Sequence, residues 1–218
     1  MKNLRVLGVL RGSWFYSLPW LRIAVHLGAW LPLIVLVAQA ALDQLGAEPI
    51  RAAILRTGKT ALVLLVLSLA CTPLNTLFGF KPALKVRRAL GLYAFLYAAL
   101  HLTLFVGVDY GFNGSLLVDA MLTKRYTLVG LAAGTILLLL AVTSFNVWKK
   151  RLGKGWKRLH RLAYLAALLA AIHFIWLVKP GVAEPYYWLA AVALLLSLRL
   201  PFIRRAITRL RYPAARKA

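Results

Sequence analysis

Acidic residues and cysteines are nearly absent from the chain, whose 218 residues include five Asp and Glu side chains and one cysteine. The single Cys71 excludes a disulfide framework, and no CxxCH sequence is present for covalent haem attachment. A GxGxxG fingerprint after a strand, a P-loop, an HExxH pair and a serine-centred triad are also missing. These absences exclude the usual nucleotide-binding domains and the common hydrolase sites.

Apolar residues dominate what is present, because 62% of the chain is hydrophobic and only 15% is charged. So much apolar surface does not fit inside one soluble core, and it indicates an integral membrane protein. Hydropathy predicts an all-α bundle of six transmembrane helices, at 18–42, 59–79, 89–108, 127–147, 159–178 and 186–202. We divide the chain into a cytoplasmic N-terminus (1–17), a six-helix transmembrane domain (18–202) and a basic cytoplasmic tail (203–218).

Basic side chains are unevenly distributed over this predicted topology. Of the 28 Lys and Arg residues, 22 fall on the side of the two chain ends, and six fall with all five acids on the other side. The positive-inside rule then places both termini in the cytoplasm. A net charge of +23 would suggest a nucleic-acid partner in a soluble protein, but here anionic lipid head groups explain it.

The four histidines all lie within predicted spans. His160 and His173 share the stretch 156–174, which we interpret as one membrane-length helix. Their 13-residue separation places them roughly 20 Å apart, near opposite membrane faces. His101 lies at the outer depth of His173, and His26 lies at the inner depth of His160. Depth therefore pairs His101 with His173.

Imidazole is costly to bury in lipid without a partner, so these histidines need an explanation. One explanation is that each hydrogen-bonds a neighbouring helix. The other is a non-covalent haem held between helices, which needs two axial histidines and a large apolar pocket. Zinc, copper and non-haem iron sites usually recruit carboxylates, and none lies in a span. The aromatic side chains available for a haem pocket are Phe95, Tyr97, Phe105, Tyr164, Phe174 and Trp176.

The inner histidines have a separate interpretation. On an ideal helix, thirteen residues leave His160 and His173 roughly 140° apart, so the two face different neighbours. We therefore consider that His26 and His160 hold a second cofactor near the cytoplasmic face, either haem or a quinone or flavin donor. The alternative is that His26 only hydrogen-bonds a neighbouring helix.

Two polar segments flank the second span. Thr72, Pro73 and Asn75 near its inner end either line a polar pocket or mark the end of the helix. Segment 43–59 is too polar for the bilayer core but has apolar residues at helical spacing, which predicts a short surface-lying helix on the outer side.

A set of short motifs extends over nearly the whole chain. They are RTGKTAL at 56–62, TPL at 72–74, RRALGLYAFLYAALHLT at 87–103, KRYTLVG at 124–130, TSFN at 143–146, and LGKGWKRLHRLAYL with IHFIW at 152–176. In these motifs the chain resembles the haem-binding membrane subunits of bacterial periplasmic protein-methionine-sulfoxide reductase systems, the MsrQ or YedZ family. That family belongs to the ferric-reductase-like transmembrane group. The W-x-x-L-H sequence followed by I-H is the most specific feature.

The resemblance implies b-type haem, an associated FMN, and a multi-pass location in the bacterial cell inner membrane. It also implies electron delivery to a periplasmic molybdopterin-dependent partner that reduces methionine sulfoxide in oxidised proteins. The family's haem-iron ligands carry over onto His101, His160 and His173. The chain departs from the wider group at Arg87, where an inner histidine is expected fourteen residues before His101. A second complete bis-histidine haem is therefore not implied.

Three functional hypotheses follow. The leading one is an electron conduit from quinol or a cytoplasmic reduced flavin, through haem, to the outer-face reductase. The chain is then not a stand-alone enzyme, and none of its residues acts as acid or base. The second is direct ferric or quinone reduction at the outer face, without the partner. The third is a histidine-containing proton or solute transporter, although the spans have no Asp or Glu relay and the halves show no obvious repeat.

Overall fold

The computed structural model describes residues 19–211, with only the backbone of residues 204 and 208–211. Regular structure in this range is helical throughout. The helices are α2 (Pro19–Ala41), α3 (Pro49–Phe78), α4 (Pro82–Thr103), the π-helix η1 (Leu104–Asp109), α5 (Gly114–Thr123), α6 (Arg125–Val142), α7 (Asn146–Leu152), α8 (Lys154–Leu159), α9 (Leu162–Leu177), α10 (Glu184–Ser197) and α11 (Pro201–Arg211). The predicted cytoplasmic segment 1–17 and the last part of the predicted tail, 212–218, lie outside the described residues.

Five helical segments of the described chain are long and apolar enough to cross a membrane. They are α2, α3, α4 with η1, α6, and α8 with α9. Helix α10 has only 14 residues. It reaches the required length only together with α11, across a bend of 62°. The prediction of a multi-pass helical protein is confirmed, and the sixth span depends on whether α10 and α11 cross the membrane as one broken helix.

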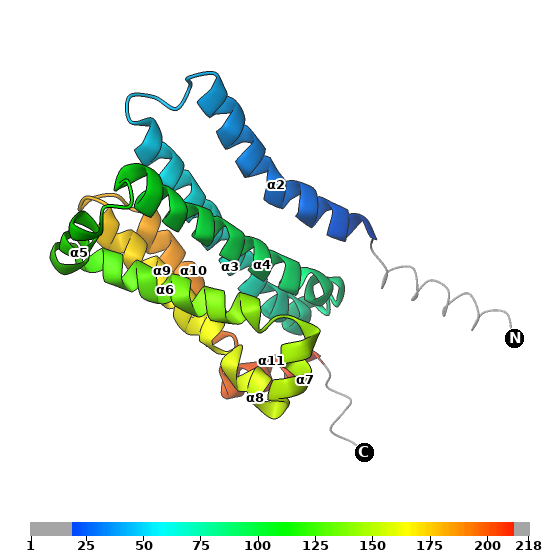
Figure 1. Ribbon diagram of the computed structural model, residues 1–218. Coiled ribbons are helices and arrows are strands. Elements are labelled where there is room, and N and C mark those ends of the chain that lie inside the picture. The colour runs from blue at the N-terminus through cyan, green and yellow to red at the C-terminus, as the bar shows by residue number, and fades with distance from the viewer. Residues whose placement is uncertain (1–18, 212–218) are drawn as a thin grey trace, which may run out of the picture.

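The long helices form an antiparallel bundle (Figure 1). Helix α3 packs along α4, and α6 packs along α9, while contacts of α4 with α6 and of α3 with α9 join the two pairs. Helix α10 lies against α9 and α3, and α2 lies at the edge against α4 and α3. Small side chains permit this close approach, because Ala94 of α4 and Ala166, Ala167 and Ala171 of α9 are fully buried.

Proline and glycine determine where the first long pair of helices begins and ends. Pro49 and Pro82 occupy the first turns of α3 and α4, where a missing N–H costs nothing. Gly79 ends α3 with a φ of 68°, and its N–H donates to the Asn75 carbonyl.

The prediction of a separate short surface helix within 43–59 is wrong. Because the chain has no break after Pro49, residues 49–58 are the first turns of one 30-residue helix.

The fifth predicted span also differs from expectation. The stretch 156–174 is not one regular helix, because a turn at His160 and Arg161 separates α8 from α9. His160 therefore lies at the junction between two helices, and the 140° estimate for its direction relative to His173 does not apply. The sequence-based spans also missed the short helices α5 and α7 and the π-helix η1.

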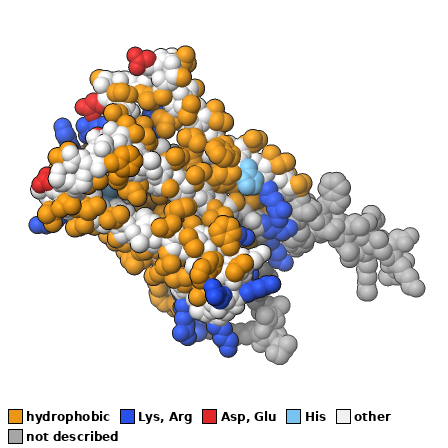
Figure 2. Space-filling view, in the orientation of Figure 1, with side chains coloured by type: hydrophobic (Ala, Val, Ile, Leu, Met, Phe, Trp, Pro, Cys, Tyr) orange, Lys and Arg blue, Asp and Glu red, His pale blue; other side chains and the backbone are white. Residues whose placement is uncertain are grey.

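Charge is segregated along the bundle axis. We call the end that carries the α2–α3 loop, η1, α5 and the start of α10 the acidic end, because all five acids lie there: Asp43, Glu48, Asp109, Asp119 and Glu184. The opposite end, which carries α7, α8 and α11, is the basic end. Figure 2 shows one face of the molecule, in which mainly hydrophobic side chains cover the middle of the bundle and most Lys and Arg side chains gather toward the basic end. The exposed apolar surface includes Leu27, Ile34, Leu67, Leu138 and Leu194, as expected of helices that face lipid.

Candidate functional site

His101 and His173 come together near the acidic end of the bundle. His101 occupies the last turn of α4, just before the π-helix η1, and His173 lies in the last two turns of α9. Their ring centres are 6.1 Å apart, and their planes are almost perpendicular at 87°. The structure thus brings together the two histidines that the sequence pairs by depth.

Each imidazole of this pair is fixed by a backbone carbonyl of the neighbouring helix. The His101 Nδ1 lies 2.9 Å from the carbonyl oxygen of Ile54 on α3. The His173 Nδ1 lies 2.7 Å from the carbonyl oxygen of Tyr126 on α6. A carbonyl only accepts, so Nδ1 carries the proton in both rings, and the lone pair is on Nε2. This tautomer is the one in which a histidine binds a metal through Nε2.

A glycine makes room for each ring. A Cβ atom on Gly58 would lie 2.9 Å from the His101 Nδ1, and one on Gly130 would lie 2.6 Å from the His173 Nδ1. Each glycine follows, by four residues, the residue whose carbonyl holds the ring, so carbonyl and glycine lie on one helix face. We call each such pair, Ile54 with Gly58 and Tyr126 with Gly130, a glycine notch.

The arrangement fits two axial ligands of one haem iron. A metal–imidazole bond is about 2 Å long, so ring centres on opposite sides of one metal lie about 6 Å apart. The observed 6.1 Å agrees with that spacing. No group of three or more His, Cys, Asp or Glu side chains able to hold a metal ion lies in residues 19–211. Two neutral imidazoles with free Nε2 lone pairs therefore suit haem better than a three- or four-ligand protein site.

Two of the aromatic residues expected around a haem bond to other groups. The Tyr97 hydroxyl donates to the Ala29 carbonyl on α2 at 2.7 Å. Tyr164 lies at the basic end with Arg199. The aromatic neighbour that the structure gives His173 is Tyr126, at 5.9 Å between ring centres, which the sequence did not single out.

His160 lies at the basic end, in the turn between α8 and α9. Its Nε2 is 3.2 Å from the Thr143 hydroxyl at the end of α6. That hydroxyl donates to the Leu139 carbonyl, so it accepts from His160. The Trp156 ring stacks on the imidazole at 4.1 Å, and its Nε1 donates to the Thr143 carbonyl. Iron ligation through the His160 Nε2 therefore requires the Thr143 bond to open.

His26 has a different neighbour. It is exposed on α2, and its Nδ1 is 2.8 Å from the Tyr93 hydroxyl on α4. The two rings meet edge to face at 5.6 Å. The described structure thus gives His26 a partner on α4 and His160 a partner on α6. A hydrogen bond from His26 to a neighbouring helix, the alternative interpretation of this residue, is present. A shared cofactor for His26 and His160 stays a prediction.

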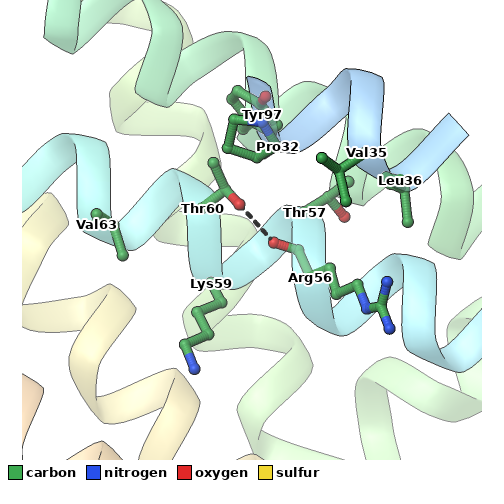
Figure 3. A pocket seen from close by; sticks show the side chains of 9 residues that line it. All are labelled: Pro32, Val35, Leu36, Arg56, Thr57, Lys59, Thr60, Val63 and Tyr97. Carbon is green, nitrogen blue, oxygen red and sulfur yellow. Dashed lines mark hydrogen bonds between the residues drawn. The ribbon is translucent and has the colours of Figure 1, made fainter. Parts of the chain in front are cut away.

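A cavity of about 330 Å³ lies between α2, α3 and α4 (Figure 3). Its lining consists of Pro32, Val35, Leu36, Arg56, Thr57, Lys59, Thr60, Val63 and Tyr97. The buried Thr57 connects this cavity to the histidine pair, because its hydroxyl contacts the Ile54 carbonyl that also holds His101. Figure 3 shows the charged ends of Arg56 and Lys59 directed away from Pro32 and Tyr97. Lys59 pairs with Glu184 on α10 at 2.6 Å.

The contacts give a physical reason for several of the sequence motifs. RTGK contains Gly58, and KRYTLVG contains both Tyr126 and Gly130 of the second notch. In TSFN, Thr143 holds His160. TPL contains Thr72, which accepts from Arg87 at 3.3 Å. Sequence reasoning missed the two notches. Each histidine follows its carbonyl partner by the same 47 residues, but this regularity is visible only once the structure shows the partners.

Comparisons with known proteins show the family of the chain. Residues 57–171 match the family described as ferric reductase like transmembrane component. The chain is 41% identical over 182 residues to the "Protein-methionine-sulfoxide reductase heme-binding subunit MsrQ" of Xanthomonas axonopodis pv. citri (strain 306), covering 81% of this chain and 84% of that protein. It is 40% identical, over the same shares, to the protein of the same name from Xanthomonas euvesicatoria pv. vesicatoria (strain 85-10). Because the match covers most of both chains, the chain belongs to the MsrQ family of the ferric-reductase-like transmembrane group.

Proposed function

We propose that this membrane haemoprotein transfers electrons through b-type haem to a periplasmic, molybdopterin-dependent protein-methionine-sulfoxide reductase, for the repair of oxidised proteins. The observation that carries the proposal is the His101–His173 pair, with ring centres 6.1 Å apart and both Nδ1 atoms fixed by backbone carbonyls. The relatives named as heme-binding subunits support it. In this role the chain is a subunit, and the reduction of the final substrate takes place on its partner.

The bound haem supplies reversible one-electron chemistry, and the residues of the chain hold and orient it. His101 and His173 would hold the haem iron. Their Nδ1–H groups donate to Ile54 and Tyr126, which fixes the ring planes and makes Nε2 more basic. Because the two ligands come from α4 and α9, haem binding would also join the two helix pairs of the bundle.

We assign electron entry to the basic end, which the positive-inside rule predicts to face the cytoplasm. The proposed donor is quinol or a cytoplasmic reduced flavin, and FMN is a proposed second cofactor. His160 is proposed as a further iron ligand, and His26 as a contributor to a cofactor near the basic end. Support for His160 is its position in the family's W-x-x-L-H motif.

The test is haem quantitation on the purified chain. We expect a reduced-minus-oxidised spectrum of a low-spin b-type haem, with haem per protein measured by the pyridine haemochrome method. His101→Ala and His173→Ala should each remove the haem at the acidic end. His26→Ala should keep that haem, because His26 is exposed and bonded to Tyr93. Loss of a different haem equivalent in His26→Ala would support the proposed cofactor near the basic end. Unchanged low-spin spectra in both ligand variants would disprove the pairing.

The family match also favours a second candidate, direct reduction of ferric iron or quinone at the acidic end. This candidate shares the haem site and differs only in the electron acceptor. Reduction of a soluble ferric chelate by the purified, pre-reduced chain, without any periplasmic partner, would support it. Electron transfer only in the presence of the reductase partner would support the first proposal.

A further inference from the structure

The basic end of the bundle has cations but no carboxylate. All five acids of the chain lie at the acidic end. The two ion pairs within the described part of the chain, Arg51 with Glu48 and Lys59 with Glu184, are there as well. Any guanidinium that enters the bundle at the basic end must therefore find a neutral partner in the protein or an anion from outside it.

Arg199 is such a guanidinium. It follows α10, and its side chain enters the bundle and is partly buried. One terminal nitrogen donates to the Tyr164 hydroxyl at 2.5 Å, and the other donates to the Leu69 carbonyl on α3. The guanidinium also lies over the Tyr164 ring, 4.7 Å from its centre. Its Nε is buried and has no hydrogen-bond partner. The charge is thus held only by neutral groups, with one donor unsatisfied.

Arg87 reaches the same turn of α3 from α4. Its guanidinium donates to the Thr72 hydroxyl at 3.3 Å, and Thr72 follows Leu69 by three residues. The groups that the two guanidiniums contact therefore lie within one turn of α3. Because both guanidiniums are positively charged, they repel each other at such a separation.

Two like charges with neutral partners are an unfavourable arrangement inside a protein. Removing a cation from water costs more than neutral hydrogen bonds return, and mutual repulsion adds to that cost. An anion with several acceptor oxygens reverses both effects, because a guanidinium donates to a phosphate through two parallel N–H bonds. Hydroxyl groups from Thr72 and Tyr164 border the same place.

We propose that Arg87 and Arg199 bind the phosphate group of a ligand at the basic end, between α3, α4 and α9. The same chemistry is available from two sources, a phosphorylated cofactor or the head group of a phospholipid. The site is separate from the His101–His173 pair, and it does not depend on the identity of the electron acceptor.

The test compares probes with and without a phosphate group, using the full-length protein in detergent and native mass spectrometry titrations. Flavin mononucleotide is paired with riboflavin, and phosphatidylglycerol is paired with diacylglycerol. We expect at least one phosphate-bearing probe to bind more tightly than its phosphate-free counterpart. Arg199→Gln and Arg87→Gln should each lower the affinity for that probe by about tenfold or more, because each removes a charge-assisted hydrogen bond. A preference for flavin mononucleotide identifies a cofactor site, and a preference for phosphatidylglycerol identifies a lipid site.

Arg88→Gln is the matched control, because Arg88 is exposed, adjacent in sequence and of equal charge. Arg88→Gln should leave the binding of all four probes unchanged. None of the three variants should change the binding of riboflavin or diacylglycerol. The proposal would be overturned if both phosphate-bearing probes bound Arg199→Gln and Arg87→Gln as tightly as they bind the wild type. It would also be overturned if Arg88→Gln lost as much affinity for these probes as Arg199→Gln and Arg87→Gln do.

Folding of the variants needs its own control, because Arg199 also joins α10 to α3 and α9. If Arg199→Gln does not fold, Arg199→Lys keeps the charge and removes the two-nitrogen geometry, and Arg87→Gln tests the site from another helix. The haem spectrum assigned to His101 and His173 should stay unchanged in all folded variants. Whether His101→Ala loses the haem spectrum tests only the proposed function, and whether the arginine variants lose phosphate binding tests only this site. Either proposal can therefore fail without the other.

Discussion

At the acidic end, two neutral imidazoles face each other and each is fixed by a backbone carbonyl, whereas at the basic end two guanidiniums meet on α3 with only neutral partners. The first arrangement is complete in hydrogen bonding except for the two Nε2 lone pairs. The second leaves one buried N–H unsatisfied and two charges uncompensated. This difference motivates the two proposals, a haem held by neutral nitrogens at the acidic end and an anion bound at the basic end.

The two ends also differ in how the helices provide space. At the acidic end, room for the rings comes from glycines inside α3 and α6. At the basic end, the turn between α8 and α9 brings His160 against Thr143. A glycine inside a helix costs roughly 0.5–1 kcal/mol of stability relative to alanine, and close approach of another group is a reason to accept that cost.

The largest expected effect concerns which end faces the cytoplasm. A C-terminal fusion to a reporter that is active only in the periplasm should be inactive, because 22 of the 28 basic residues lie on the side of the termini. The same reporter inserted after Lys179, between α9 and α10, should be active. Activity of the C-terminal fusion together with inactivity of the insertion after Lys179 would reverse the orientation and exchange the roles assigned to the two ends. Activity of both would mean that α10 and α11 do not cross the membrane as one broken helix.

The glycine notches are expected to show the next largest effect. Gly130→Ala should lower haem affinity by about 10–100-fold, because the new methyl group would displace the His173 ring from its carbonyl partner. Gly58→Ala should do the same to a smaller extent, since the overlap with His101 is less severe. Haem titration of the apoprotein, with the low-spin spectrum as a second measurement, tests both.

Gly134→Ala is the control for these variants. Gly134 lies one turn further along α6, and a Cβ there has no neighbour within 4 Å. This change should keep haem affinity and leave stability equal or slightly higher. If Gly130→Ala and Gly134→Ala have the same haem affinity, the notch does not position His173.

A moderate effect is expected from Thr143→Val at the basic end. This change removes the hydroxyl that accepts from His160 and keeps the side-chain volume, so it should destabilise the protein by about 1 kcal/mol. Thermal unfolding measures the loss, and the haem spectrum at the acidic end should not change. Thr135→Val on the same helix is the control, because its hydroxyl bonds only the Leu131 carbonyl four residues earlier. A large change of the haem spectrum in Thr143→Val would show either that the two ends are coupled or that His160 itself binds iron once the Thr143 bond is removed.

The smallest effect is expected from the ion pairs at the acidic end. Lys59→Gln removes the bond to Glu184, but about half of each side chain is exposed, so the loss should stay below about 1 kcal/mol and decrease with salt. Arg51→Gln should behave in the same way. Thermal unfolding at low and high salt tests both. A loss larger than that of Thr143→Val would mean that surface charge, and not buried hydrogen bonding, stabilises this region.

The sequence alone indicated a helical membrane protein, because apolar runs of membrane length and a one-sided distribution of basic residues are properties of the chain itself. It also paired His101 with His173, because depth follows from the helical rise per residue. The boundaries were less predictable. Segment 49–58 joined α3, since the local pattern of a surface helix does not show whether the next helix continues it.

Only the tertiary structure decided which groups hold each histidine. The Ile54 carbonyl lies 47 residues before His101, and such long-range partners depend on how α3 packs along α4. In the same way, the turn at His160 and Arg161 and the approach of Arg87 and Arg199 to one turn of α3 result from packing between helices. Composition and periodicity determine which segments are helices and how deep a residue lies, but the direction of a side chain is determined by the neighbours against which its helix packs.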